Sequence, residues 1–272
     1  MPFSHETPFH QAVILHDLSA LANLLKQNPE GWKKPNKLGF NALELAKLLD
    51  FKDAVELLNP YKPSRIRVFL KNSSHFVKLT PIEFEKQFKT SAYSSLKFQS
   101  YLALQETLRN VPLCYPFLLD KNPASNNLQN HVHLETHPHL AIKWIDTALE
   151  YGLFSTEPIE ADILIGEYTG LVRKVDRSHP NLNAYCVKYP SRFFSWNYFV
   201  IDALAGGNAM RFINHSDQPN LEAHWVLDRR LLHLVITTQQ LISKNTQLTL
   251  NYGPDFWQHR RKHEIINYKK NN

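Results

Sequence analysis

The sequence lacks any long hydrophobic run. No window holds the roughly 18 or more consecutive apolar residues that would span a bilayer, and the opening residues MPFSHETPFHQ have neither the charged nor the apolar region of a secretory signal. We therefore expect no membrane partner and a cytoplasmic location. A secretion signal read by a dedicated machinery would escape this test and would place the protein in a host cell or its nucleus.

Cysteine is also scarce. The chain has only Cys114 and Cys186, outside any Cys-x-x-Cys spacing, so the sequence indicates neither a disulfide framework nor a thiolate zinc site. With 272 residues, 43% hydrophobic and 21% charged, the composition is that of a soluble folded protein in a reducing compartment.

The net charge of +6 is distributed unevenly. Residues 61–137 carry 10 basic and 5 acidic side chains and residues 257–272 carry 5 and 1, whereas residues 138–256 carry 10 and 12. A basic excess is typical of nucleic-acid binding, so the middle segment and the tail keep that hypothesis open. Residues 138–256 favour a basic partner instead, such as a lysine-rich peptide.

Residues 1–60 predict two helical hairpins, with helices at 7–15, 18–27, 41–48 and 52–58. A helical pattern begins at Thr7-Pro-Phe-His-Gln-Ala12, and a second begins 34 residues later at Asn41-Ala-Leu-Glu-Leu-Ala46, after a glycine-containing turn. This period and opening resemble the ankyrin repeat; a plain pair of hairpins is the alternative. Since about three repeats are needed to bury a continuous core, we expect this element to pack against the rest of the chain and to dock a protein partner.

Residues 61–137 predict a mixed α/β segment whose role stays open. Residues 65–70 and 75–79 read as strands, and Thr80-Pro-Ile-Glu83 has the N-cap, proline and glutamate of a helix start. Residues 94–110 predict a second helix. Its expected core positions are Leu96, Leu102, Leu104 and Leu108.

Residues 120–139 contain four histidines at positions His131, His133, His137 and His139. Imidazole is a common zinc ligand, but no cysteine and no helical His-x-x-x-His spacing accompanies them. We expect a solvated loop and no metal site.

From residue 140 onward the sequence predicts a mostly β domain. Short β-like runs occur at 141–145, 151–154, 163–168, 184–187, 198–202 and 231–237. Turn formers separate them, and no helices of the length needed for βαβ units lie between them.

Five motifs in this part resemble, in order, those of SET-domain lysine methyltransferases. They are Tyr151-Gly-Leu-Phe154, Ile163-Leu-Ile-Gly-Glu-Tyr-Thr-Gly170, Phe199-Val-Ile-Asp-Ala203, Gly207-Asn-Ala-Met-Arg-Phe-Ile-Asn-His-Ser216 and Leu248-Thr-Leu-Asn-Tyr-Gly253. The resemblance covers roughly residues 138–257. It implies an α+β chain in which a mostly β SET domain with a knotted C-terminal segment follows the ankyrin-like element and the mixed segment, and precedes a basic tail at 258–272.

The resemblance also implies the cofactor S-adenosylmethionine and its site. Tyr252 would be the catalytic tyrosine and Tyr168 would line the lysine channel; packed core tyrosines are the alternative. The implied cofactor-binding residues are Tyr151, Gly152, Leu153, Arg211, Asn214, His215, Tyr252 and Trp257. Among them Tyr151–Leu153 would contribute backbone groups, Asn214 would lie near the cofactor's amino-acid end, and His215 would offer backbone contacts near the adenine. Phe256 and Trp257 would cover the adenine, or else cap the core. We expect Arg211-Phe-Ile to be a strand held in the core.

The reaction requires little from the protein beyond alignment. Methyl transfer to lysine is an in-line displacement that needs a neutral amine, whereas free lysine has a pKa of about 10.4. Burial beside the cofactor's positive sulfur lowers that pKa, so no carboxylate base is required. Tyrosine hydroxyls and backbone carbonyls suffice to hold the amine on line.

The sequence departs from the family pattern in three places. Glu150 replaces the first glycine of the Gly-x-Gly loop, Leu250 occupies the usually aromatic position that tunes the number of methyl groups, and the cysteine-rich zinc cluster that often comes after the domain is absent. We make no prediction of mono-, di- or trimethylation. The leading hypothesis is a protein-lysine methyltransferase acting on a basic protein such as a histone, in a combination of elements that resembles bacterial effectors. An inactive SET-like scaffold and a nucleic-acid binder are the alternatives.

Overall fold

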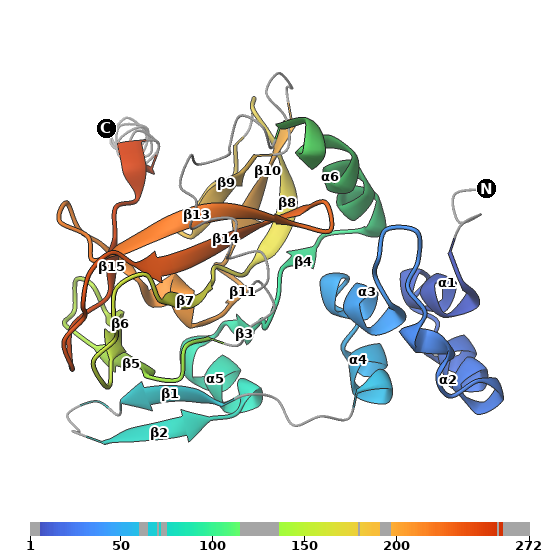
Figure 1. Cartoon of the computed structure of the whole chain (residues 1–272), viewed down its shortest axis with the longest axis horizontal. Coiled ribbons are helices and arrows are strands. Elements are labelled where there is room, and N and C mark those ends of the chain that lie inside the picture. The colour runs from blue at the N-terminus through green and yellow to red at the C-terminus, as the bar shows by residue number, and fades with distance from the viewer. Residues whose placement is uncertain are drawn as a thin grey trace, which may run out of the picture.

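The structure is a computed structural model, and it describes residues 6–59, 65–69, 71, 75–114, 136–178, 180–190, 197–254 and 256–257 (Figure 1). Its helices are α1 (Pro8–Ile14), α2 (Leu18–Gln27), η1 (Gly31–Lys33), α3 (Ala42–Leu48), α4 (Lys52–Leu58), α5 (Pro81–Phe88), α6 (Tyr101–Cys114) and η4 (Ala209–Phe212). Within the residues described, no helix has both the length and the apolar character needed to cross a membrane.

The strands are short and gather into five sheets. They are β1 (Ile66–Phe69), β2 (Phe76–Leu79), β3 (Ser91–Ala92), β4 (Lys97–Phe98), β5 (Leu140–Trp144), β6 (Tyr151–Ser155), β7 (Leu164–Glu167), β8 (Leu171–Asp176), β9 (Cys186–Tyr189), β10 (Asn197–Asp202), β11 (Gly206–Gly207), β12 (Asn214–His215), β13 (Leu221–Asp228), β14 (Leu231–Thr238) and β15 (Thr249–Leu250). The sheet orders are β2-β1-β5-β6, β4-β8-β10-β9, β13-β14-β7, β11-β3 and β12-β15. The predicted mixture of helices with a strand-rich C-terminal part is confirmed.

The four N-terminal helices form where the sequence predicts them, and three of their starts have a side-chain cap. Thr7 and Asp17 accept a hydrogen bond from a backbone N–H in the first turn of α1 and α2 respectively, and Asn41 forms a capping box with Glu44. The connecting turn is held by Asn36, whose side chain accepts from the N–H groups of Leu38 and Phe40. The ankyrin assignment of this element stays a prediction.

The helical element shares its core with the strand-rich part. One buried cluster contains side chains of α1–α4 together with Leu104 of α6, Val172 of β8 and Leu232 of β14. At the surface, Arg229 of the β13–β14 turn donates to the Glu44 carboxylate of α3 at 2.7 Å. The expectation that this element packs against the rest of the chain is confirmed.

Residues 65–98, which belong to the segment of unknown role, form strands in the same sheets as the C-terminal part. β1 pairs with β5 in parallel, β4 with β8, and β3 with β11, so residues 65–98 supply a strand to three of the sheets. In Figure 1 these strands lie against the strand-rich part along its lower side and centre. Residues 65–98 thus pair with strands that follow residue 137, and the predicted domain bounds stay predictions.

Two local predictions are wrong. The helix expected at 94–110 begins at Tyr101, because Lys97 and Phe98 pair with β8. As part of the same error, Leu102 is not a core position: it is 73% exposed, since it lies about 200° around the helix from the buried Leu104. The strand expected at 211–213 is instead the short 3₁₀ helix η4, where the Asn208 side chain accepts from the N–H of Met210. The predicted strands at 141–145, 151–154, 163–168, 184–187, 198–202 and 231–237 are confirmed to within about two residues at each end.

The prediction of a knotted C-terminal segment stays a prediction. The structure adds that β12 and β15 pair in parallel, with Asn214 opposite Thr249 and His215 opposite Leu250. This pairing brings the Asn-His motif beside the segment that carries Tyr252.

Candidate cofactor and catalytic site

The turn before β6 keeps a glycine-like shape despite its glutamate. Glu150 adopts a left-handed φ of 57°, the region that glycine favours, and its carbonyl accepts from the N–H of Ile145 at 2.7 Å. Gly152 comes next in tight surroundings, because a Cβ there would lie 2.7 Å from Ile145 Cδ1 and 3.0 Å from Gln247 Nε2. The loop that the sequence places in doubt is therefore formed.

Asn214 connects this loop to the Arg-Phe-Ile-Asn-His segment. Its Nδ2 donates to the carbonyl of Tyr151 at 3.1 Å, across 63 positions of sequence. Its Oδ1 has no hydrogen-bond partner in the part of the chain that the structure describes. A free acceptor thus lies beside the strand whose backbone the sequence assigns to the cofactor.

His215, Tyr252, Phe256 and Trp257 form an aromatic cluster. The His215 ring lies 5.4 Å from Tyr252 and 4.9 Å from Trp257, and Phe256 lies 4.7 Å from Tyr252. Nδ1 of His215 accepts from the Tyr252 N–H at 3.2 Å, so Nε2 is the nitrogen that donates to Asp217. The ring is thus held by hydrogen bonds at both nitrogens, and the neighbouring aromatic rings meet it and one another at interplanar angles of 51° to 87°.

Two tyrosine hydroxyls converge near this cluster. Tyr252 donates to the carbonyl of Ile213 at 2.6 Å, and Tyr168 donates to the carbonyl of Tyr185 at 2.9 Å. Burial raises the pKa of Tyr252 to about 12, with a further contribution from Tyr185. Burial, and then Tyr252, raise the pKa of Tyr168 well above its usual value. Both phenols therefore stay protonated at neutral pH.

Arg211 lies on the tyrosine side of the site. Its guanidinium is 4.2 Å from the centroid of the Tyr185 ring, and its Nε donates to the carbonyl of Ala203 at 2.9 Å. Burial lowers the pKa of Arg211, while Tyr185 and Tyr168 oppose that shift. The structure thus places Arg211 under the tyrosines, and its predicted role in shaping the cofactor pocket stays a prediction.

An acidic side chain anchors the loop that carries Tyr185. Asp202 accepts from Arg173 Nε at 2.7 Å and from Asn183 Nδ2 at 3.0 Å, and Asn183 Oδ1 in turn accepts from the Tyr185 N–H. Burial alone would raise the pKa of Asp202, but the hydrogen bonds from Asn183, Leu204 and Arg173 hold it below its usual value.

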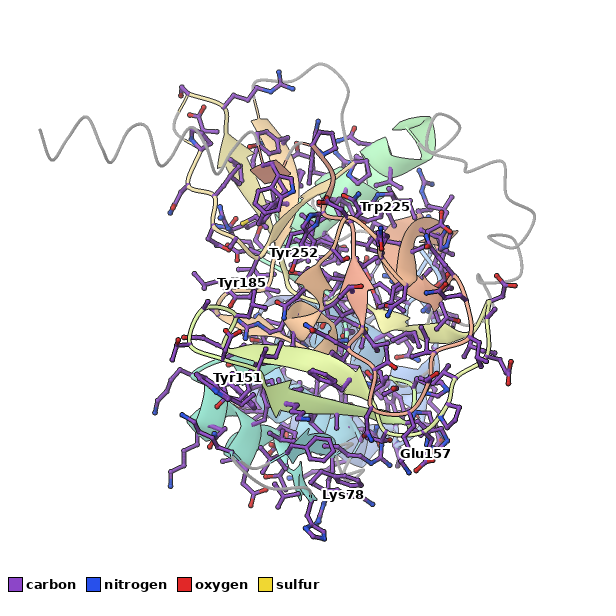
Figure 2. All side chains as sticks on the ribbon, turned by 90° about the vertical axis from the view of Figure 1, so that its left-hand side faces the viewer. Lys78, Tyr151, Glu157, Tyr185, Trp225 and Tyr252 are labelled. Carbon is purple, nitrogen blue, oxygen red and sulfur yellow. The ribbon has the colours of Figure 1, made fainter. Side chains whose placement is uncertain are left out.

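Most of the predicted site residues are joined by contacts into one region. Figure 2 shows Tyr151, Tyr185 and Tyr252 along the same face of the molecule. Leu153 is fully buried, and its carbonyl accepts from the N–H of Leu248 at 2.8 Å, so neither its side chain nor its backbone is exposed to a ligand. Sequence reasoning missed Tyr185, whose motif Ala184-Tyr-Cys-Val187 signals only a strand, and the carbonyl of Ile213, which has no side-chain signal at all.

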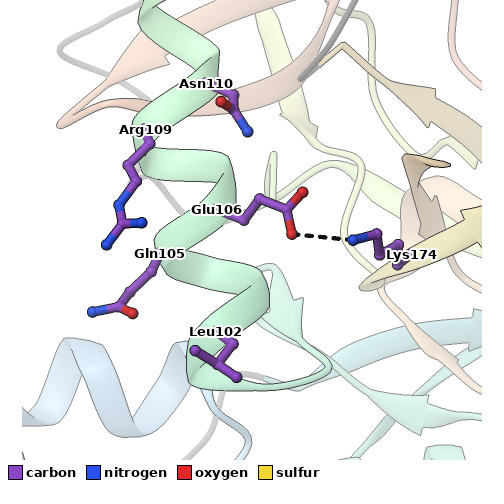
Figure 3. Close-up of a pocket in the computed structure, with 6 residues that line it drawn as sticks. All are labelled: Leu102, Gln105, Glu106, Arg109, Asn110 and Lys174. Atoms are coloured by element: carbon purple, nitrogen blue, oxygen red, sulfur yellow. Dashed lines mark hydrogen bonds and ion pairs between the residues drawn. The ribbon is translucent and has the colours of Figure 1, made fainter. Parts of the chain in front are cut away.

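The remaining candidates contribute little to this region. Within the described ranges no group of three or more His, Cys, Asp and Glu could hold a metal ion. His137 and His139 have ring centroids 5.4 Å apart, and burial lowers the pKa of His137; His131 and His133 lie outside the described residues. A pocket of about 490 Å³ lies between α6 and Lys174, away from the tyrosines, and its Glu106 pairs with Lys174 at 3.4 Å (Figure 3).

Comparison with known proteins assigns this region. Residues 150–253 match the family model described as "SET domain". This part of the chain is similar to SET domains. The match includes the loop at Tyr151 and the cluster at Tyr252, and it lies within the predicted range of 138–257; the outer bounds stay predictions.

Several curated relatives are similar to a part of this chain. The chain is 34% identical over 115 residues to "Histone-lysine N-methyltransferase SETD1" of Drosophila melanogaster, with 41% of this chain and 7% of the relative covered. It is 34% identical over 106 residues to human "Histone-lysine N-methyltransferase SETD1B", with 38% and 5% covered. These matches thus span about a fourteenth to a twentieth of the relatives' own length.

Among solved structures, "Arabidopsis thaliana SUVH6 in complex with SAM" aligns with a TM-score of 0.37 and 26% identity, covering 46% of this chain and 28% of that one. At this TM-score the likeness supports no argument about the site.

Proposed function

We propose that the chain is a protein-lysine N-methyltransferase that uses S-adenosylmethionine. The observation that carries the proposal is that the Tyr252 hydroxyl bonds to the carbonyl of Ile213, next to Asn214, whose amide bonds to the Tyr151 loop, in a region that matches the SET domain model. The curated relatives reported above are histone-lysine N-methyltransferases, which supports the same reaction class here.

The residues present fit this cofactor. A Cβ at Gly152 would press on the side chains of Ile145 and Gln247, and the Oδ1 of Asn214, which has no partner among the described residues, suits the ammonium of the cofactor's amino-acid end. The rings of His215, Phe256 and Trp257 meet edge to face, at 71° and 87°, and offer aromatic surface for an adenine. When bound, S-adenosylmethionine supplies a methyl group attached to a positively charged sulfur.

The two tyrosines would hold the lysine amine. Because the pKa of each phenol is raised, each keeps its proton and donates it to a backbone carbonyl, and its oxygen lone pairs remain available to the amine. Tyr252 is 36% exposed and Tyr168 is half-buried, so a substrate lysine that covers them would be desolvated, which lowers its pKa towards the neutral form. Tyr185 and Arg211 would fix the wall of this channel.

The departures at Glu150 and Leu250, which motivate the inactive-scaffold alternative, do not favour it in the structure. Glu150 retains the left-handed backbone that a glycine would adopt, and the loop keeps its contact with Asn214. The departure at Leu250 concerns a side chain that packs against the core, opposite His215. Neither change removes a group that the proposed reaction needs.

The proposed substrate is a basic protein, with histones as the first candidate. The balance of 10 basic and 12 acidic side chains in residues 138–256 favours a lysine-rich peptide. Recruitment of a partner by the helical element, its ankyrin identity and an effector role belong to this proposal and rest on the sequence alone.

The test is transfer of a labelled methyl group from S-adenosylmethionine to histones by the full chain. Tyr252→Phe should lower labelling about 100-fold, the cost of losing one positioned hydrogen-bonding group at a reacting centre. Tyr101→Phe is the matched control. It also removes a tyrosine hydroxyl, but that hydroxyl donates to Glu6 at 2.8 Å, at the start of the helical element and outside the proposed site.

Calorimetry with the cofactor separates binding from chemistry, since Tyr252→Phe should still bind. Absence of labelling on histones and on cell extract, or equal labelling by wild type and Tyr252→Phe, refutes the proposed reaction. Labelling confined to non-histone proteins keeps the reaction and removes the histone substrate.

A further inference from the structure

The outer face of the sheet β2-β1-β5-β6 carries side chains of a distinctive kind. The pairing register places Val68, Ile142 and Leu153 on the buried face of the sheet. The opposite face carries three cations and three phenylalanines, which we call the aromatic–basic face: Arg67, Phe69, Phe76, Lys78, Lys143 and Phe154. The other outward positions of these strands are Ala141 and Gly152, so none of them is acidic.

The rings and cations of this face alternate in space. Lys143 Nζ lies 5.4 Å from the Phe154 ring and 6.0 Å from the Phe69 ring, and the Arg67 guanidinium lies 5.7 Å from the Phe76 ring. Phe69 and Phe76 meet edge to face at 5.8 Å. No ring of the face is therefore more than one side chain away from a positive charge.

The face is accessible at its cations and at its outermost ring. Lys78 and Lys143 are exposed, and Phe76 is 40% exposed, an unusual fraction for a phenylalanine. In Figure 1 the β1–β2 hairpin lies along the lower edge of the molecule, and in Figure 2 Lys78 projects from that edge. The exposed Arg65 and Lys71 extend the positive charge at the ends of the strands.

We propose that the aromatic–basic face binds single-stranded nucleic acid. Cations that follow a backbone neutralise phosphates, and aromatic rings between them stack on unpaired bases, which a duplex keeps hidden. Four strands about 4.8 Å apart give a face about 14 Å wide, comparable to the sheets on which two or three bases stack. An acidic peptide would use the cations but gain little from the rings. The inference does not depend on methyl transfer, because it uses a different surface.

The face also explains where the basic excess of residues 61–137 is placed. Arg67 and Lys78 come from that segment, and Lys143 comes from the strand β5 that pairs with it. Glu157, an exposed acidic residue two positions beyond β6, is neutralised by an ion pair with Lys244 at 2.9 Å. Glu157 therefore does not oppose the cations of the face.

The test measures binding of the full chain to fluorescent oligothymidylate and oligouridylate of about 12 nucleotides, a length within the usual single-strand site sizes. Lys78→Glu and Lys143→Glu should each weaken binding at low salt, and Lys78→Ala should lower the magnitude of the salt slope by about 0.7. Phe76→Ala should weaken binding about tenfold and Phe76→Trp should restore it, because stacking needs a ring.

Matched controls lie in the helical element. Lys26→Glu reverses one exposed charge there, and Leu57→Ala removes an apolar side chain with 41% exposure, close to that of Phe76. Both should bind like wild type, and circular dichroism should show every variant folded at the assay temperature.

Three outcomes overturn the proposal. One is unchanged binding in both lysine reversals, which would assign the affinity to the basic tail. A second is equal or tighter binding of a duplex of the same length. The third is tighter binding of poly-glutamate or of anionic lipid vesicles than of the single strand.

Discussion

Asn214 and Asn220 offer a paired test of the proposed cofactor site. The two asparagines lie six positions apart, and both tie distant segments together. Asn214 uses only its Nδ2, which donates to Tyr151, whereas Asn220 uses both ends: Nδ2 donates to the Gln247 carbonyl and Oδ1 accepts from the Thr249 N–H, each at 2.9 Å. Their replacement by alanine should therefore have opposite consequences for stability and binding.

The stability costs depend on burial and on the number of bonds lost. Asn214→Ala removes one partly exposed hydrogen bond, worth about 1 kcal/mol, which lowers Tm by about 2–4 °C for a chain of this size. Asn220 is 8% exposed, so its removal leaves a donor and an acceptor without partners in a buried place. That costs about 2–4 kcal/mol, or a Tm decrease of about 5–15 °C.

For cofactor binding, Asn214→Ala should be the more damaging of the two substitutions. If Oδ1 of Asn214 accepts from the cofactor's ammonium, a charge-assisted bond of about 1.5–3 kcal/mol is lost, and affinity for S-adenosylmethionine falls about 10- to 150-fold. Asn220→Ala should bind within about threefold of wild type when it is assayed well below its Tm. Thermal unfolding and calorimetry on the same samples supply both numbers. Equal losses of affinity in the two variants, or wild-type affinity in Asn214→Ala, would refute the assignment.

The remaining predictions concern the supports of the site and of the fold. Asp202→Asn should lower stability at neutral pH by about 2 kcal/mol, through weaker bonds to Arg173 and Asn183. Because the pKa of Asp202 is depressed, its carboxylate stabilises the folded state above about pH 4, and this stabilisation is lost as the pH falls through the folded-state pKa. Stability should therefore fall more steeply below pH 4 in wild type than in the variant. Arg229→Ala should lower Tm by about 2–4 °C and speed hydrogen exchange in α3, whereas Lys33→Ala, which removes the exposed pair with Glu30 and a contact with the Trp32 ring, should leave both unchanged. Gly206→Ala should destabilise the fold by about 1–3 kcal/mol, since its Cβ would lie 2.2 Å from the Tyr93 ring. In the Tyr93→Ala background the same substitution should cost less, because the ring is gone; an equal cost in both backgrounds would show that the clash is not the cause.

Local signals were sufficient for the helices of the N-terminal element. Thr7, Asn41 and Thr80 each begin a helix within one residue of the predicted position, because a capping side chain acts on its own first turn. The same locality explains the error at residues 94–100, where nothing in the segment itself announces that β4 will pair with β8.

Strand detection failed where burial is irregular. β13 alternates poorly, with buried positions at Leu221, His224 and Val226, so its sequence does not show a period of two. β8 and the two-residue strands β3, β11, β12 and β15 form because partners far away in sequence supply the other edge. Such pairings depend on tertiary packing rather than on the residues of the strand itself.

The site residues were recognisable as motifs, but their geometry was not. Tyr252 and Asn214 could be named from their neighbours in sequence, whereas the contact of Asn214 with Tyr151 needs the pairing of β12 with β15. Tyr185 was missed because its position is set by Asp202 and Asn183, through a hydrogen-bond network with no sequence spacing of its own.

This arrangement separates the residues that hold the site from those that orient it. Beneath the polar contacts lie Leu153, Phe212, Ile213 and Leu248, which belong to one buried cluster. Apolar burial of such side chains contributes about 1.5–3 kcal/mol each, more than the single hydrogen bonds at the surface of the site. A substitution in this cluster therefore shifts every element of the site together and reports on folding. A substitution of Asn214 or Tyr252 changes one polar contact above an intact core, and only variants of that second kind can assign a chemical role.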